Sequence, residues 1–232
     1  MAINVIEPGL QFYVDKLNAG ETFSFNRFGN GEWDCILDLF TRTRSGSQEF
    51  TPKLRTELTK VITERHASPN SILAIQNIPY LIKIDMLSKV EPWLKDKPKI
   101  KWHLGDVFHR ASRDGQLAPL FAALKKHRVI IVGPPWLMSL PFSSVFVPVV
   151  EKNCWDNVDE LTERLSGFKN AVISFSAGPT TKVLIHRLFP IIGNSCFLID
   201  AGSLWDPYCG VKSRKYHHLM NDDVIRGVHA SD

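Results

Sequence analysis

Three polar residues lie on a glycine-rich turn in the stretch FSFNRFGNGEWDCIL, between a predicted buried strand and a predicted amphipathic helix. Gly29 and Gly31 let the backbone turn sharply and approach a ligand closely. Arg27 can hold a phosphate through two hydrogen bonds, and free N–H groups at a helix start also bind phosphate. This turn, with Asn30 and Glu32 as its other polar residues, therefore predicts a phosphate site.

Two roles are open for Glu32. A carboxylate beside a phosphate repels it unless a cation bridges the two groups. Alternatively, Asn30 or Glu32 caps the helix and complements its dipole. The turn is not a dinucleotide fingerprint, because GxGxxG needs a third glycine where this chain has Asp34.

A second turn follows the apolar run AVISF, in the stretch AVISFSAGPTTKVLIHRL. Proline suits the first position of a helix, so Pro179 after Gly178 indicates a helix start. The hydroxyl of Thr180 lies near the free N–H groups of that helix. The pattern is typical of an anion-binding turn, and equally of a well-formed helix start with no ligand.

A third turn follows the run SCFLI. Asp200 ends this predicted strand, and Gly202 and Ser203 lie in the turn after it. A carboxylate at the end of a parallel strand is well placed to bind a ribose or a metal, or to transfer a proton. Asp206 follows in an irregular segment where aromatic and basic residues alternate, a composition that suits a sugar or a nucleobase. The candidates in this segment for binding an acceptor are Lys212, Arg214, Tyr216 and His217.

Positive charge is concentrated in residues 95–128, which hold nine Lys or Arg and three Asp, whereas the whole chain has a net charge of +4. A local positive field attracts phosphates, nucleic acid, an acidic glycan or a lipid headgroup. A solvated surface is the alternative explanation. The candidates in this window for binding an anionic acceptor are Lys97, Lys99, Lys101, Arg110 and Arg113.

Strand-like and helix-like segments alternate along the chain. Short β-rich runs occupy residues 22–27, 71–76, 99–104, 128–132, 144–150, 171–175 and 195–199. Helix-compatible segments occupy residues 31–40, 51–66, 79–90, 117–127, 157–165 and 179–189. The alternation predicts an α/β, Rossmann-like fold with a mostly parallel sheet and helices on both faces. Ligands bind such sheets at the carboxyl ends of the strands, so the turns after the strands are the candidate site.

Length and composition favour one globular domain over residues 1–232, with an irregular basic and aromatic segment at 203–232. No apolar stretch is long enough to suggest a membrane span, and the first residues do not resemble a signal peptide. The four cysteines form no CxxC pair, which argues against a zinc site and for a reducing compartment. We expect a cytoplasmic protein.

The motifs in their order resemble the GT-D glycosyltransferases: an R-F-G-x-G-E turn, a strand ending in a glycine turn, a G-P-T helix start and a final strand ending in D-x-G. The resemblance spans roughly residues 23–208, and RFGNGE and AGPTTKVL are its most specific parts. It implies a Rossmann-like fold and a nucleotide-sugar donor. In that family an Asp-x-Glu signature in the first turn is associated with a divalent metal, such as Mn²⁺ or Mg²⁺, and with the donor diphosphate.

This chain departs from the family pattern at two positions. Asn30 replaces the aspartate of the signature while Glu32 matches it, and a neutral amide is a weaker ligand for a hard cation. The departure at Asn30 thus predicts that Glu32 binds one metal weakly or none. Ser203 stands where the family commonly has a histidine. The type members of the family add glucose to bacterial surface glycoproteins. The residues after Ser203 diverge further from the family pattern, which indicates a different acceptor for this chain.

We expect the three turns to bind the donor. The candidates for catalysis are Glu32, which the family signature includes, and Asp200 or Asp206, which lie at or just after the end of the last predicted strand. The favoured function is transfer of a sugar from a UDP-sugar to a hydroxymethylated base, 5-hydroxymethylcytosine, in phage duplex DNA. A surface polysaccharide, a glycoprotein or a lipid-linked glycan is the alternative acceptor. A nucleotide-binding or nucleic-acid-binding module without catalysis is the alternative of another class. Another Rossmann enzyme, a methyltransferase or a dehydrogenase, is weakened by the failed glycine fingerprint.

Overall fold

One parallel sheet organises the protein. The computed structural model describes residues 3–97, 99–221 and 225. Within them, eight parallel strands form a sheet in the order β1-β4-β3-β2-β8-β7-β5-β6. The strands are β1 (Asn4–Ile6), β2 (Ser24–Phe28), β3 (Ser71–Ile75), β4 (Lys101–Leu104), β5 (Arg128–Gly133), β6 (Val145–Pro148), β7 (Ala171–Phe175) and β8 (Cys196–Asp200).

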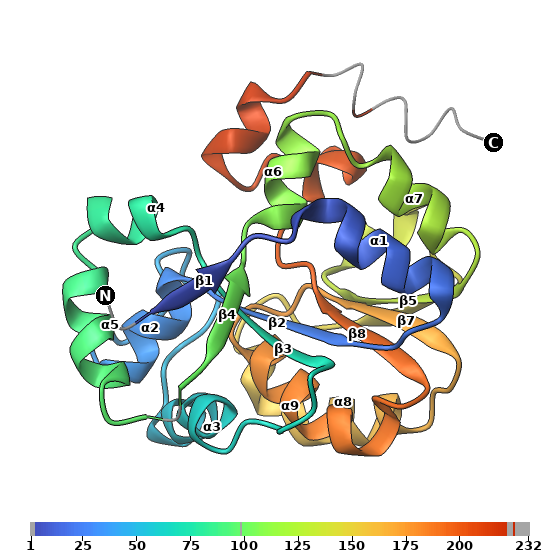
Figure 1. Cartoon of the computed structure of the whole chain (residues 1–232). Helices are drawn as coiled ribbons and strands as arrows, with labels where there is room; N and C mark the ends of the chain where they lie inside the picture. The colour runs from blue at the N-terminus through green and yellow to red at the C-terminus, as the bar shows by residue number, and fades with distance from the viewer. Residues whose placement is uncertain (1–2, 98, 222–224, 226–232) are drawn as a thin grey trace.

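Helices connect the strands and cover both faces of the sheet (Figure 1). The α-helices of the described part are α1 (Gly9–Ala19), α2 (Asn30–Ile36), α3 (Pro52–Thr63), α4 (Ile78–Lys83), α5 (Leu87–Leu94), α6 (Val107–Arg113), α7 (Ala118–Leu124), α8 (Val158–Ser166) and α9 (Thr180–Ile192). Short 3₁₀ helices are η1 (Pro135–Ser139), η2 (Cys154–Asn157), η3 (Asp206–Cys209) and η4 (Lys215–Leu219).

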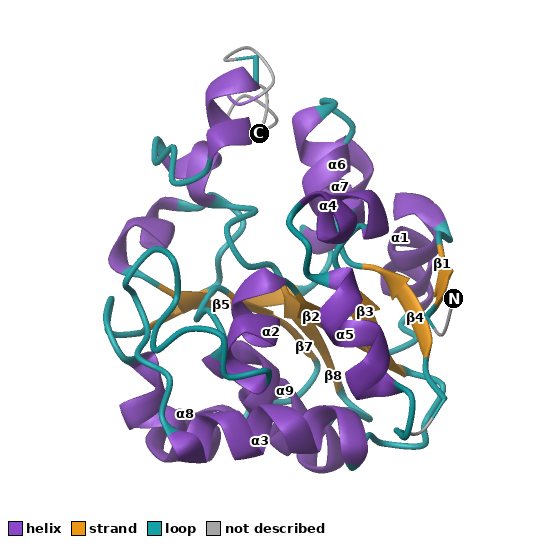
Figure 2. Ribbon diagram, turned by 90° about the vertical axis from the view of Figure 1, so that its left-hand side faces the viewer, coloured by secondary structure: helices purple, strands orange, loops and turns teal. Residues whose placement is uncertain are grey.

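The core has two layers because successive strand residues point to opposite faces. Phe25 and Phe28, three positions apart on β2, belong to different apolar clusters. Phe25 packs on the face covered by α1, α6 and α7, whereas Phe28 packs on the face covered by α2, α3, α8 and α9. Figure 2 shows these helix layers on either side of the sheet. The expected fold class is therefore confirmed, and every strand pair in the described sheet is parallel.

The structure also contains elements that the sequence patterns do not predict. Strand β1 has three residues and helix α6 has seven, which is too short for a clear period. Helix α1 was also not predicted. The helical pattern over 79–90 is divided between α4 and α5, because Asp85 adopts a left-handed φ of 54° between them. Non-glycine residues rarely adopt that conformation, so the sequence pattern alone did not indicate a break there.

Strand order brings the distant turns together. The chain proceeds from β2 to β3 and β4 on one side of the sheet, while β8 and β7 lie on the other side of β2. β2 pairs directly with β8 (Ser24 with Leu198), so the turns after these strands are neighbours at a topological switch point. Ligands bind open parallel sheets at such points.

No helix in the described ranges is both apolar enough and long enough to cross a lipid bilayer. All four cysteines are free thiols: Cys35, Cys154 and Cys196 are buried, and Cys209 is half-buried.

Candidate active site at the carboxyl edge of the sheet

A cleft of about 1260 Å³ lies at the carboxyl ends of the strands. Its walls come from the turns after β2 to β8, from the loop at residues 43–48, and from the segment that follows η3. Cavities that hold one small molecule are typically about 300–1,000 Å³. This cleft therefore has room for a nucleotide sugar together with part of a second substrate.

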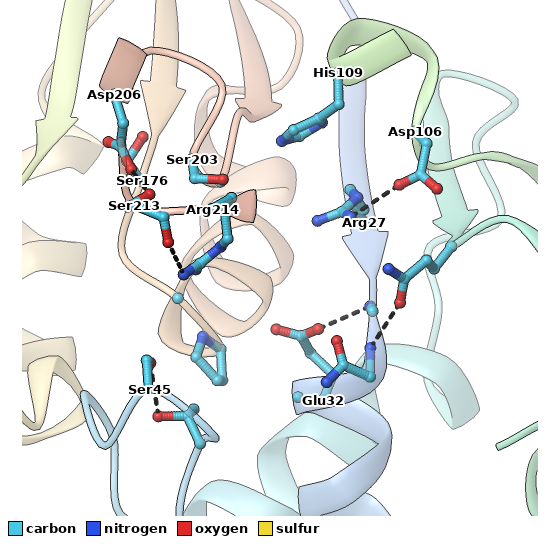
Figure 3. A pocket seen from close by; sticks show the side chains of 18 of the residues that line it. Arg27, Glu32, Ser45, Asp106, His109, Ser176, Ser203, Asp206, Ser213 and Arg214 are labelled. Atoms are coloured by element: carbon cyan, nitrogen blue, oxygen red, sulfur yellow. Dashed lines mark hydrogen bonds and ion pairs between the residues drawn. The ribbon is translucent and has the colours of Figure 1, made fainter. Parts of the chain in front are cut away.

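Arg27 is held at the centre of one wall, on β2 (Figure 3). Its backbone N–H donates to Asp200 Oδ2 at 3.2 Å, and its Nη2 donates to Asp106 Oδ1 at 2.9 Å. Burial lowers the pKa of Arg27, but the charges of Asp106 and Asp200 outweigh burial and raise it overall. Arg27 thus keeps its positive charge in a largely buried position.

A lysine that the sequence patterns did not indicate lies between two of the predicted carboxylates. Lys182 Nζ is 3.0 Å from Glu32 Oε1 and 2.8 Å from Asp200 Oδ2. All three residues are at most 6% exposed. Burial lowers the pKa of Lys182, but Asp200 and Glu32 raise it overall, so the lysine stays charged. Burial raises the pKa of Asp200, and Lys182 and Arg27 oppose that rise.

The first glycine turn is fixed by side chains. Glu32 Oε2 accepts a hydrogen bond from the Gly29 N–H at 2.8 Å, so Glu32 caps α2 as one of the two sequence interpretations proposed. Gln76 Oε1, from the turn after β3, accepts from the Asn30 N–H at 3.0 Å. These bonds use two of the N–H groups that were expected to be free for phosphate.

The opposite wall is built from η3 and the segment after it. Asp206 accepts a hydrogen bond from Trp136 Nε1 at 3.0 Å and another from Ser213 Oγ. Burial raises the pKa of Asp206, and those two hydrogen bonds partly oppose the rise. Arg214 and Ser203 lie on the same side of the cleft, facing Arg27 and His109 across it (Figure 3).

Several buried polar atoms around the cleft have no hydrogen-bond partner in the protein. They are Arg27 Nε, His109 Nδ1, Ser176 Oγ and Asp200 Oδ1. Burial, and then the positive charge of Arg27, hold the pKa of His109 well below its usual range, so its imidazole is neutral. Buried polar groups in native proteins are nearly always satisfied by protein, water or a ligand. Three of these four residues, Arg27, His109 and Ser176, line the cleft, so its walls are polar.

Comparison with solved structures finds a similar fold in three structures of one domain. A glycosyltransferase from Streptococcus sanguinis with the domain of unknown function 1792 superimposes with a TM-score of 0.68 at 16% identity, over 89% of this chain and 83% of the other. A selenomethionine form of this domain gives 0.69 and 16%, over 89% and 80%. A third structure, described as a distinct glycosyltransferase fold, gives 0.66 and 18%, over 89% and 80%.

The chain has the GT-D glycosyltransferase fold. The fold expected from the motif order is thereby confirmed. No protein-family model and no curated protein matches the sequence. The GT-D fold therefore rests on three-dimensional similarity at low sequence identity.

The GT-D fold brings most of the predicted site residues to one cleft. Those that line it are Arg27, Gly29, Asn30, Gly31, Glu32, Gly178, Pro179, Gly202, Ser203, Asp206, Arg110, Arg113, Arg214 and Tyr216. Thr180 and Asp200 lie behind the surface, buried at 0% and 1% exposure.

Other predicted site residues are placed elsewhere. His217 is fully buried, and its Nδ1 accepts a hydrogen bond from the Arg214 N–H at 3.3 Å, so it positions this segment and does not face a ligand. Lys212 is exposed and outside the cleft lining. Lys97, Lys99 and Lys101 lie before or at the start of β4, whereas the cleft is at its far end. That position separates these three lysines from the cleft.

The sequence patterns missed several residues of the cleft, among them Asp106, His109 and Lys182. Asp106 follows strand β4 just as Asp200 ends β8, so the strand-end signal that found Asp200 would also have found it. His109 lies on the unpredicted helix α6. Lys182 is one of the first residues of α9 and resembled an ordinary helix lysine, because the sequence does not show that α9 points it at β2 and β8.

A divalent cation does not fit at Glu32. One carboxylate oxygen accepts from the Gly29 N–H and the other pairs with the Lys182 ammonium. A cation ligated there would have to displace the ammonium. In the part of the chain that the structure describes, no three His, Cys, Asp or Glu residues are grouped to hold a metal.

Proposed function

We propose that this protein is a glycosyltransferase that takes a hexose or pentose from a UDP-sugar and transfers it to a hydroxyl acceptor. The observation that carries the proposal is the cleft at the β2–β8 switch point. There, the half-buried Arg27 lines a space large enough for a nucleotide sugar, together with His109 and Ser176, each of which carries a buried polar atom without a partner in the protein. The GT-D fold supports this proposal, because the glycosyltransferase from Streptococcus sanguinis shares it.

Arg27 is proposed to bind the donor diphosphate. Its side chain lines the cleft, is 18% exposed, and is fixed by Asp106 through Nη2. During transfer, the bond between the sugar C1 and the phosphate oxygen breaks, and UDP leaves with the electron pair. A preorganised cation stabilises the charge that develops on the leaving group. Arg27 therefore serves binding and leaving-group stabilisation together.

Asp206 is proposed to accept the proton of the acceptor hydroxyl. At the same time, the oxygen of that hydroxyl forms the new bond to C1. The Asp206 carboxylate lines the cleft opposite Arg27, and burial raises its pKa, which makes it a stronger base than an exposed aspartate. Asp200 has a different role, because it contacts Lys182 and the Arg27 backbone behind the cleft surface. Asp200 is proposed to position those two cations.

The acceptor is proposed to be 5-hydroxymethylcytosine in duplex DNA. Arg110, Arg113 and Arg214 line the cleft and could contact backbone phosphates beside a base turned out of the stack. The side chains of Arg110 and Arg113 are about half exposed, at 48% and 49%.

One experiment tests donor and acceptor together. The protein is incubated with duplex DNA that contains 5-hydroxymethylcytosine and, separately, with each common UDP-sugar; mass spectrometry of the nucleosides detects transfer. The expected result is a hexose or pentose adduct with one donor. A thermal-shift panel of nucleotide sugars, S-adenosylmethionine and NAD runs in parallel, since a bound ligand raises Tm. A shift with a nucleotide sugar but no DNA adduct would redirect the acceptor to a glycan. A shift only with S-adenosylmethionine or NAD would overturn the proposed donor.

A further inference from the structure

The ion cluster behind the cleft has a cation at its centre. Lys182 extends from the first turn of α9, with a side chain only 4% exposed. Its ammonium contacts Glu32 Oε1 at 3.0 Å, Asp200 Oδ2 at 2.8 Å and the Gly178 carbonyl oxygen at 3.4 Å. An ammonium has three N–H donors, so these three oxygens account for all of them.

The oxygens come from three separate turns. Glu32 follows β2, Gly178 follows β7 and Asp200 ends β8. Two carboxylates and one carbonyl converging on a point make a set of hard oxygen ligands of the kind that divalent cations use. Here the protein's own ammonium occupies that point, so a bound metal and Lys182 exclude each other.

The charges show why the lysine is required there. Without Lys182, the Glu32 and Asp200 carboxylates would meet in a buried space. Uncompensated buried charge is strongly destabilising. A second cation of the site, Arg27, is already paired with Asp106 at 2.9 Å. Lys182 therefore offsets one of the two negative charges that would otherwise repel a donor diphosphate bound at Arg27.

We propose that Lys182 takes the place of a divalent cation in this protein, so that binding of a nucleoside diphosphate in the cleft is independent of metal. The inference rests on the proposed function for the identity of the ligand, but the occupancy of the cation position is independent of it. Asn30 is consistent with this assignment, because a lysine-filled site has no use for a second metal-ligating carboxylate on that turn.

The first test is calorimetric titration of the protein with UDP, in excess EDTA and in excess MnCl₂. The expected dissociation constants agree within about threefold. A tightening of about tenfold or more with MnCl₂ would overturn the proposal. If UDP binds in neither condition, the proposed function fails, and the manganese titration below still decides what occupies the cation position.

The second test is titration of Mn²⁺ followed by electron paramagnetic resonance of the free ion. The wild-type protein is expected to bind no Mn²⁺ at this position, and Lys182→Met, which leaves two adjacent carboxylates, is expected to bind one ion. The double variant Lys182→Met/Glu32→Gln is expected to lose that ion again. Lys60→Met is the matched control, since Lys60 pairs with Glu57 at 2.9 Å on the surface and its loss should create no site.

The variants separate the outcomes clearly. If the wild-type protein binds Mn²⁺ and Glu32→Gln abolishes that binding, Glu32 is a metal ligand and the proposal is wrong. If Lys182→Met does not fold without metal but is recovered when MnCl₂ is present during refolding, the cation requirement is confirmed. If Lys182→Met folds and binds no Mn²⁺, the three oxygens do not form a cation site, and the proposal is also wrong.

Discussion

At the scale of single residues, Arg27 and Glu32 do different work although they share one turn. Arg27 lines the cleft with a side chain that is 18% exposed, whereas both oxygens of Glu32 are engaged within the protein. The arginine is therefore suited to meet a ligand directly, and the glutamate to hold the turn and the ammonium behind it.

Replacing Arg27 should weaken binding of UDP. A hydrogen bond to a charged group contributes about 1.5–3 kcal/mol, so Arg27→Ala is expected to raise the dissociation constant about 10- to 150-fold. Calorimetry with UDP measures this. Asp106→Asn is the control, since it loosens the guanidinium without removing it and should have a smaller effect. Unchanged affinity in Arg27→Ala would place the diphosphate elsewhere.

Glu32→Gln should lower the rate of transfer more than it lowers stability. The amide oxygen can still accept from the Gly29 N–H, so the cap on α2 survives, while the charge that holds Lys182 is lost. We expect the rate to fall by at least about tenfold, or 1.4 kcal/mol, with a folded protein by circular dichroism. Near-full activity with the correct donor would reduce Glu32 to a helix cap.

Asp206→Asn should lower the rate about 100-fold or more if Asp206 accepts the acceptor proton. The rate is measured at saturating donor and acceptor, and UDP affinity serves as the control that the cleft is intact. His109→Gln provides the comparison, because His109 is the neutral imidazole on the facing wall. A large loss in His109→Gln with little loss in Asp206→Asn would reverse the assignment.

At the scale of elements, the contact between α1 and β4 carries a pH dependence. Tyr13 OH and His103 Nδ1 are 2.7 Å apart, and His103 is 9% exposed. Burial, with a further contribution from Lys101, lowers the pKa of His103 to about 4. The unfolded chain, in which the pKa of His103 is near 6.5, therefore takes up a proton at a higher pH than the folded protein does. The contribution of His103 to stability is complete above about pH 6.5 and is lost as the pH falls toward 4.

The pH profile of His103→Gln should accordingly be flatter than that of the wild type. One proton taken up on unfolding changes the free energy of unfolding by about 1.4 kcal/mol per pH unit. Urea titrations between pH 7 and 4 measure the slope. Parallel profiles for the two proteins would show that His103 titrates normally.

At the scale of the whole molecule, the fold divides the basic window between two ends of the sheet. Arg110 and Arg113, on α6, line the cleft, while Lys97, Lys99 and Lys101 lie at the amino end of β4. A compact ligand in the cleft can therefore contact the two arginines but not the three lysines, although all five basic residues were expected to bind one acceptor.

Duplex binding should follow this division. Log affinity should fall with log salt at about −0.9 per phosphate contact. Charge reversal of Arg110 and Arg113 to Glu is expected to weaken duplex binding and to reduce that slope by about two contacts. Reversal of Lys97, Lys99 and Lys101 is the charge-matched comparison and should have the smaller effect. A protein that binds no duplex at low salt would end the DNA proposal.

The sequence alone determined the fold class and the turns at which chemistry is placed. Near-continuous apolar runs alternating with helical segments specify a parallel sheet, and a parallel sheet puts every strand's carboxyl end at one edge. Arg27, Glu32, Ser203 and Asp206 could be found for that reason, since each lies on or directly after a strand end or on the segment that follows one.

Only the tertiary structure decided which of these residues touch. Strand order places β2 beside β8. The packing of α9 then directs Lys182 toward both Glu32 and Asp200, two residues that lie more than a hundred positions apart along the chain. Local patterns carry no information about such distant pairs, because periodicity reports only which face of an element is buried. The lysine in the place of a metal, and the separation of the basic window, follow from packing alone.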